Sequence, residues 1–198
     1  MLAAWAGFQN ATETQTQWRK VMGTATQTTF QPRIYVACLA AYNSGYLHGA
    51  WIDAAQEPWS IFDDVKAMLA ASPVRGAEEW AIHDYEDFGG VRIEEYTGFE
   101  RVSGLAAFIA EHGEIGAALL AHYCGDLDEA REAMADRYMG EHTSLADYVQ
   151  DLTEESTPIP QPLRYYIDYQ AMARDAELNG ELFALTTSFE VVHVFAGC

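Results

Sequence analysis

The first regular pattern of apolar and polar positions lies between residues 33 and 53. Residues 34–39 are a short run of β-branched and other apolar residues, residues 42–45 carry turn-forming types, and residues 46–53 resume the strand pattern. The pattern predicts a β-hairpin whose two strands are joined by a longer loop.

A helix and a third strand are predicted after this hairpin. Ser60 is placed to cap a helix, with Asp63 three residues further on in capping-box position. Pro73 and Gly76 end the helix, and residues 79–84 have strand character. The apolar positions that share one helical face are Ile61, Phe62, Val65, Met68 and Leu69. Together these elements predict a ββαβ unit that ends near Tyr96.

The middle of the sequence is helical in pattern. Apolar residues follow helical spacing from Leu105 to Tyr123, with a break at Gly113. Residues 126–129 resemble a capping box, and the helix that they open is expected to carry Ala130, Met134 and Tyr138 on one face. Residues 144–147 give a further capping signal, which opens another helix.

The end of the sequence predicts one more helix and a hairpin. Three prolines at positions 158, 160 and 162 interrupt the helical pattern. A final helix is expected to carry Leu163, Tyr166, Ile167 and Gln170 on one stripe and to end at Asn179 and Gly180. Residues 182–186 and 191–195 are then predicted to pair as a hairpin, so the fold class is α+β.

Charge is distributed very unevenly along this chain. It has 30 Asp+Glu against 11 Lys+Arg, a net charge of −19. Residues 1–50 hold one acid and three bases, whereas residues 51–198 hold 29 acids and eight bases, a net of −21. Packed as one compact globule, the acidic segment would be about 38 Å across, and 21 charges correspond to about 36 Å of duplex DNA. Such a surface repels nucleic acid and anionic membranes and attracts proteins with a DNA-binding groove. Adaptation to high salt and simple solubility give rise to similar compositions.

The acids lie off the apolar stripes of the predicted helices, and few basic residues stand four positions away to neutralise them. Rigid elements that display unpaired carboxylates are what imitation of a phosphate backbone requires. The predicted partner-binding acids are Asp63, Asp64, Glu78, Glu86, Asp87, Glu94, Glu95, Asp128, Glu129, Glu132, Asp136, Asp147, Asp151, Glu154 and Glu155.

Signals of catalysis are weak. The sequence has no GxSxG, phosphate loop or GxGxxG, and His112, His122 and Cys124 lack metal-ligand spacing. We therefore predict no catalytic residue, no metal and no cofactor; the open alternatives are a small acidic hydrolase that uses His83 with a carboxylate, and a salt-adapted interaction module. Three widely spaced cysteines fit a reducing cytoplasm, and no uninterrupted apolar run reaches the roughly 20 residues of a membrane span.

Four blocks of this sequence, in order, resemble the ArdA family of antirestriction proteins. They are residues 33–45 with 49–53, residues 79–86, residues 136–141 with 144–148, and residues 165–175. The resemblance covers about residues 33–195 and leaves residues 1–32 outside as a predicted flexible Thr/Gln-rich extension.

The resemblance implies an elongated three-domain protomer: an N-terminal α/β domain at residues 33–96, a helical domain at 97–131 and a second α/β domain at 132–198. It also implies a homodimer joined through the third domain, whose acids imitate bent B-form DNA. The implied partner is a type I restriction–modification enzyme, through its specificity and methyltransferase subunits. The dimer-contact role falls on Asp136, Tyr138, Met139, Gly140 and Tyr148.

Overall fold

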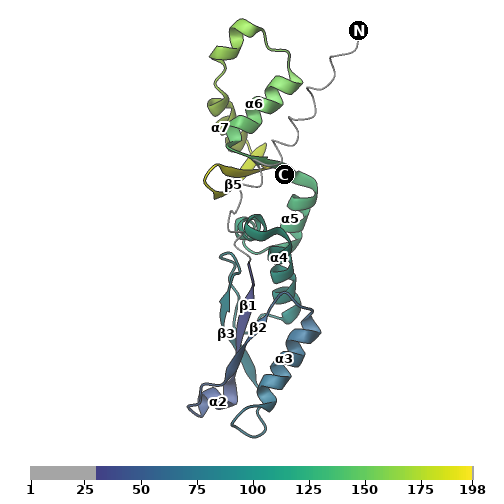
Figure 1. The fold of residues 1–198 in the computed structure, drawn as a ribbon, viewed down its shortest axis with the longest axis vertical. Helices are drawn as coiled ribbons and strands as arrows, with labels where there is room; N and C mark the ends of the chain where they lie inside the picture. Colours follow the sequence, from purple (N-terminus) through teal and green to yellow (C-terminus); the bar gives the residue numbers. More distant parts are fainter. Residues whose placement is uncertain (1–29, 198) are drawn as a thin grey trace, which may run out of the picture.

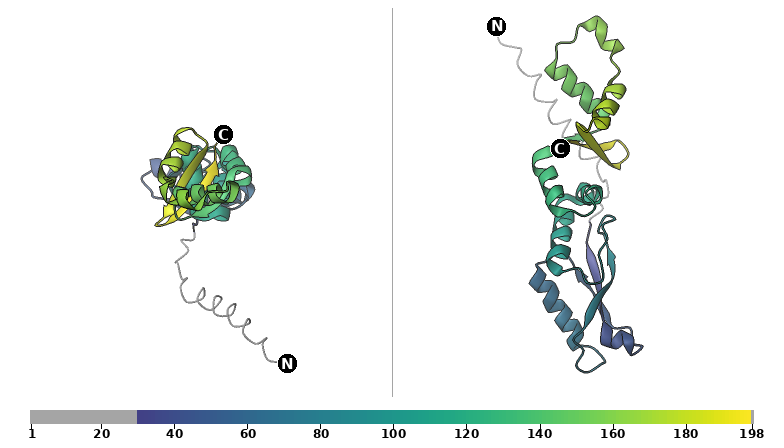
Figure 2. Two further views of the ribbon diagram at one scale, coloured as in Figure 1. Left: turned by 90° about the horizontal axis from the view of Figure 1, so that it is seen from above. Right: turned by 180° about the vertical axis from the view of Figure 1, so that it is seen from behind.

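The computed structural model describes residues 30–197 as an elongated chain with one small sheet toward each end (Figures 1 and 2). Most of the predicted extension, residues 1–29, and Cys198 lie outside the described residues. Its last three residues belong to the fold: Pro32 is buried and its carbonyl accepts a hydrogen bond from the Ala54 amide, while the Gln31 amide donates to Asp87. The predicted start of order at Arg33 was therefore three residues too late.

The N-terminal sheet confirms the predicted ββαβ unit. Its strands are β1 (Arg33–Cys38), β2 (Gly49–Asp53) and β3 (Trp80–Glu86), antiparallel in the order β2-β1-β3. The hairpin loop contains a short helix, α2 (Leu39–Asn43), and α3 (Pro58–Ala70) precedes β3. The predicted capping box was wrong, because α3 begins at Pro58, with Glu57 at the N-cap, and Ser60 and Asp63 already lie inside the helix.

One glycine is required by the close approach of β1 and β2. A Cβ at Gly49 would lie 2.6 Å from the Val36 carbonyl oxygen and 2.7 Å from the Tyr35 ring. The Tyr35 side chain therefore lies across the position that any larger residue would occupy.

The long apolar helix α4 (Phe99–His122) is kinked at Gly113, where φ is 62°, as the break in the pattern predicted. By length and composition alone α4 is apolar enough to cross a membrane. Eleven of its residues are buried in the folded chain, and it packs against α3, α5 and β5. Burial within the protein therefore accounts for its apolar composition.

The next helix is shorter than predicted. Asp126 caps α5 (Leu127–Glu132) by accepting hydrogen bonds from the amides of Asp128 and Glu129, which confirms the capping signal. A single π-helical turn, η1 (Ala133–Arg137), follows, and the chain then enters strand β4 (Tyr138–His142). The prediction that Tyr138 lies on a helical face was wrong, because β4 pairs with β6 and Gly140 adopts φ 116°.

The C-terminal sheet has the order β4-β6-β5, with β5 (Leu182–Ser188) and β6 (Val191–Ala196) forming the predicted hairpin. Ser144 caps α6 (Leu145–Ser156), also as predicted. The predicted final helix is instead two elements, the 3-10 helix η2 (Gln161–Tyr166) and α7 (Tyr169–Leu178). They separate because Ile167 is extended and the Asp168 carboxylate accepts a hydrogen bond from the Ala171 amide, which starts a new helix.

The described residues contain two apolar clusters. The larger joins the first sheet to α3, α4 and α5, and it also includes Phe195 of β6. The smaller lies between the second sheet and the helices α6 and α7, around Leu145, Val149, Ala173 and Val194. The fold is α+β as predicted, and the division into three domains stays a prediction. The acidic segment is elongated, so the compact globule assumed for it in the sequence analysis was wrong. Its 21 net negative charges are spread over a greater length, and the charge per unit length is lower than for a compact globule.

Candidate interaction surface

The acids that the sequence singled out are on the surface. Fourteen of the fifteen are exposed, and the exception, Glu154, keeps 29% of its side chain accessible. They come from α3, the end of β3, the connections before and after β3, α5, η1 and α6, and therefore extend along most of the molecule (Figure 1). The structure does not gather them into a single site.

More of these acids are paired than the sequence predicted. The bridges are Lys66–Asp63 (3.1 Å), Arg33–Glu86 (2.6 Å), Arg92–Glu94 (2.9 Å), Arg131–Asp128 (3.9 Å), Arg137–Glu129 (3.2 Å), Arg137–Glu132 (3.8 Å) and Arg164–Glu154 (3.5 Å). None of these bridges joins residues four positions apart, so the predicted scarcity of basic partners at that spacing holds among residues 30–197. The expectation that the carboxylates are unpaired was wrong for seven of the fifteen, because their partners lie two or three positions away, on a neighbouring strand or in a neighbouring element. Exposed pairs of this kind contribute about 0–1 kcal/mol each to stability.

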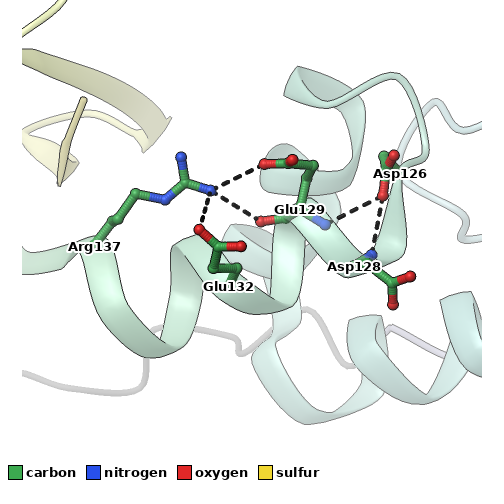
Figure 3. Close-up of polar contacts among 5 residues, drawn as sticks. All are labelled: Asp126, Asp128, Glu129, Glu132 and Arg137. Atoms are coloured by element: carbon green, nitrogen blue, oxygen red, sulfur yellow. Dashed lines mark hydrogen bonds and ion pairs between the residues drawn. The ribbon is translucent and has the colours of Figure 1, made fainter. Parts of the chain in front are cut away.

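Arg137 is the exception, because its side chain is only 10% exposed. Figure 3 shows its guanidinium directed toward Glu129 and Glu132. Its guanidinium approaches the Glu129 carboxylate at 3.2 Å and the Glu132 carboxylate at 3.8 Å, and it also donates to the Glu129 carbonyl. It lies 5.6 Å from the centre of the Tyr123 ring. A single buried cation at the end of η1 therefore holds two acids of α5 in place. Sequence reasoning missed Arg137, because nothing in the pattern distinguishes it from a surface arginine.

We expect Arg137→Ala to lower the free energy of unfolding by about 2 kcal/mol, the usual cost of losing hydrogen bonds to a charged group. Chemical denaturation would measure it, with Arg174→Ala, which removes an exposed arginine from α7, as the control. Equal stability of the two variants would contradict a structural role for Arg137.

Asp147 has a role in folding. Its carboxylate accepts hydrogen bonds from the hydroxyls of Thr143 and Ser144, and Ser144 in turn accepts from the Asp147 amide. The hydrogen bond from Thr143, followed by that from Ser144, lowers the pKa of Asp147. This acid therefore supports the N-terminal cap of α6 by holding the Ser144 hydroxyl, as well as adding to the surface charge.

The family model described as antirestriction protein (ArdA) matches residues 34–191. This chain belongs to the ArdA family of antirestriction proteins. A search of curated proteins finds no match. The matched span of this ArdA protein runs from β1 to the start of β6 and includes all fifteen predicted partner-binding acids.

The dimer-contact residues assigned to this ArdA protein lie in η1, β4 and α6. Asp136 and Met139 are exposed, whereas Tyr138, Gly140 and Tyr148 are half-buried. The Tyr148 ring contacts the His142 ring with centroids 4.9 Å apart. β4 is an edge strand of its sheet, so its outer side is unpaired within the described residues. The dimer contact itself stays a prediction.

The hydrolase alternative gains no support from the site geometry. His83 is exposed on β3, and its ring meets the Tyr42 ring edge-on at 5.2 Å. Asp84 instead accepts a hydrogen bond from the Tyr85 amide. An open hollow of about 470 Å³ between α6 and residues 165–170 includes Ser144 and Asp147 but no histidine or cysteine. Among residues 30–197 there is no cluster of three or more His, Cys, Asp or Glu able to hold a metal ion.

His193 is a buried titratable group in the C-terminal sheet of this protein. Its side chain is buried, with Nδ1 2.9 Å from the Tyr138 hydroxyl and Nε2 3.3 Å from the Thr187 hydroxyl. Burial lowers the pKa of His193, and the nearby carboxylates of Glu141 and Glu114 oppose that shift without cancelling it. The folded state therefore binds the proton less readily than the unfolded chain does.

From this sign we expect the stability contributed by neutral His193 to be present above about pH 6.5, the ordinary histidine value, and to be lost as the pH falls below it. His193→Asn, which has no titrating ring, should show a shallower fall in unfolding free energy between pH 7.5 and 5.5. Parallel curves for the two proteins would rule out His193 as the source.

Proposed function

We propose that this ArdA protein inhibits type I restriction–modification enzymes by occupying their DNA-binding groove in place of duplex DNA. The observation that carries the proposal is that exposed carboxylates come from elements along the whole of an elongated body, in a segment of net charge −21. On α6, Asp147, Asp151 and Glu155 stand four residues apart, which places them about 6 Å apart along the helix axis. This gives a regular row of negative charge on a rigid element.

The proposed mechanism is competition. Lysine and arginine side chains that line a DNA groove pair with phosphates, and carboxylates on a stiff scaffold can satisfy them instead. Because the acids are held by folded elements, binding does not incur the ordering entropy of a flexible acidic tail. The protein offers no base edges, so inhibition is expected to be independent of the recognition sequence of the target enzyme.

The partner in this proposal is the core of the type I enzyme, made of specificity and methyltransferase subunits, and the inhibitor acts in the cytoplasm.

We further propose that the inhibitor is a homodimer joined through its C-terminal part. Sedimentation velocity combined with small-angle scattering tests the dimer, for which we expect twice the chain mass, 44 kDa from 22.0 kDa. A monomer at micromolar concentration would contradict the dimer and leave competition by a single chain intact.

The central experiment is capture of a purified type I methyltransferase complex by the immobilised protein, with and without competing duplex DNA. We expect capture, and we expect duplex DNA to displace the complex. Capture that DNA does not reduce would overturn the mimic mechanism. A chain that unfolds at low salt and captures nothing would support the salt-adapted module instead.

A further inference from the structure

An aromatic row crosses one face of the C-terminal sheet. Phe183 of β5 is in register with Phe195 of β6, and Tyr138 of β4 is in register with Phe195 on its other side. The Phe183 and Phe195 rings are stacked with centroids 4.8 Å apart, and the Tyr138 ring lies 5.2 Å from Phe195. The three rings therefore join all three strands of this sheet.

The C-terminal end of α4 docks on this row. The His122 ring is stacked on Phe183 with a centroid distance of 4.5 Å and an interplanar angle of 2°. The neighbouring Tyr123 ring meets Phe183 edge-on at 6.2 Å. Parallel and edge-on aromatic contacts of this kind have preferred geometries, so they fix orientation as well as distance.

The row lies between the two apolar clusters of the protein. On β6, Val194 belongs to the small cluster under α6 and α7, whereas the next residue, Phe195, belongs to the large cluster that contains α4. Successive residues of a strand point to opposite faces. The second sheet therefore has α6 and α7 on one face and the aromatic row, which meets the end of α4, on the other.

Exposed acids lie on both sides of this junction. Asp64 belongs to α3 in the N-terminal part, and Asp151 and Glu155 belong to α6 beyond the second sheet. A partner with a rigid groove engages both groups at once only when the angle between the two parts matches the groove. When geometry prevents simultaneous engagement, the gain from joining two weak binding surfaces is lost.

We propose that the stack formed by His122, Phe183, Phe195 and Tyr138 is the joint that holds the C-terminal acids at a fixed angle to the N-terminal acids, and that inhibition depends on this angle. These are positioning residues, since none of them carries the surface charge. The inference rests on the proposed function. Its test measures the angle, through the distance between two labels, separately from the inhibition of the enzyme.

The test measures the distance between spin labels carried by noncanonical residues at Ala70 of α3 and Ser156 of α6, both exposed. Labelled chain is diluted with unlabelled chain so that an assembled dimer contains one labelled copy. The variants are His122→Ala, which removes an exposed ring, Phe183→Ala, and His122→Phe, which retains a ring in the stack. His83→Ala is the matched control, because it removes an exposed histidine–aromatic contact distant from the joint.

We expect His122→Ala and Phe183→Ala to broaden the distance distribution and to weaken inhibition of a type I enzyme by about two- to tenfold, the range of one aromatic pair. His122→Phe should keep the wild-type distance distribution and the wild-type inhibition, and His83→Ala should also leave both unchanged.

Circular dichroism and thermal unfolding confirm that the variants are folded. Because the His122 side chain is exposed, His122→Ala tests the stack without removing a buried side chain from the core. A distribution unchanged in both alanine variants overturns the joint. Broadening with undiminished inhibition overturns the role of the angle. Absence of inhibition by the wild type overturns the proposed function, while the distances still test the joint.

Discussion

Replacement of six exposed acids by their amides is expected to weaken binding to a type I enzyme by more than a hundredfold. None of the six makes an ion pair with another residue in the described part of the chain, so the substitutions remove surface charge without breaking an internal bridge. They are Asp64, Glu78, Glu95, Asp136, Asp151 and Glu155.

The size of this effect follows from addition of weak contacts. An exposed ion pair contributes about 0.2–1 kcal/mol, so any one amide, such as that at Asp64, should have a small effect. Separate sites add, and six of them give about 3 kcal/mol, which is roughly two orders of magnitude in Kd. Affinity should also fall with added salt, because exposed charges are screened within about a Debye length.

The matched control keeps charge at the same six positions by exchanging aspartate and glutamate, and it should bind almost as well as the wild type. Binding by titration calorimetry, with thermal unfolding to confirm the fold, makes the comparison. The mimic mechanism predicts a graded loss as the number of amides increases. A scan in which one or two acids carry the whole effect is the behaviour of an enzyme and would overturn it.

The N-terminal part of this fold was readable from the sequence because its information is local. The strand from Ile34 and the break at Gly113 each depend on a few neighbouring residues, and both are confirmed. The predicted hairpin is also present, but Tyr42 and Asn43 lie in α2 rather than in a turn, and the second strand begins at Gly49 rather than at Tyr46. The capping signals of Asp126 and Ser144 were equally reliable, since a cap acts within one helical turn. The exposure of the acids was also predictable, because charged residues off an apolar stripe face solvent.

The predictions that were wrong depend on pairing over long sequence distances. Tyr138, the first residue of β4, was read as helix because Ala130, Met134 and Tyr138 fit helical spacing. What makes Tyr138 a strand residue is its pairing with β6, more than 50 positions later. The burial of Arg137 depends on the same turn, which brings its guanidinium back to Glu129 and over Tyr123. The paired state of the acids is likewise a tertiary property, as the Arg33–Glu86 bridge between two strands shows.

Phe195→Ala is expected to cost about 3–5 kcal/mol of unfolding free energy, the range for removal of a fully buried phenylalanine. Phe195 is 0% exposed, and its ring contacts Phe183 on one side and Tyr138 on the other. The substitution therefore leaves a cavity where the second sheet meets the larger apolar cluster. Because all three strands of that sheet contribute a ring to this contact, the loss should loosen the sheet as a unit.

Phe189→Ala is the control within the same hairpin. Phe189 lies in the turn between β5 and β6 and is 88% exposed, so its removal should stay within about 0.5 kcal/mol of the wild type. Denaturant unfolding measures both variants. Limited proteolysis of Phe195→Ala should cut first in residues 138–197, while the first sheet, whose cluster retains its own buried residues, stays protected. Equal stability of the two variants, or first cleavage within residues 33–86, would show that Phe195 does not connect the second sheet to the main core.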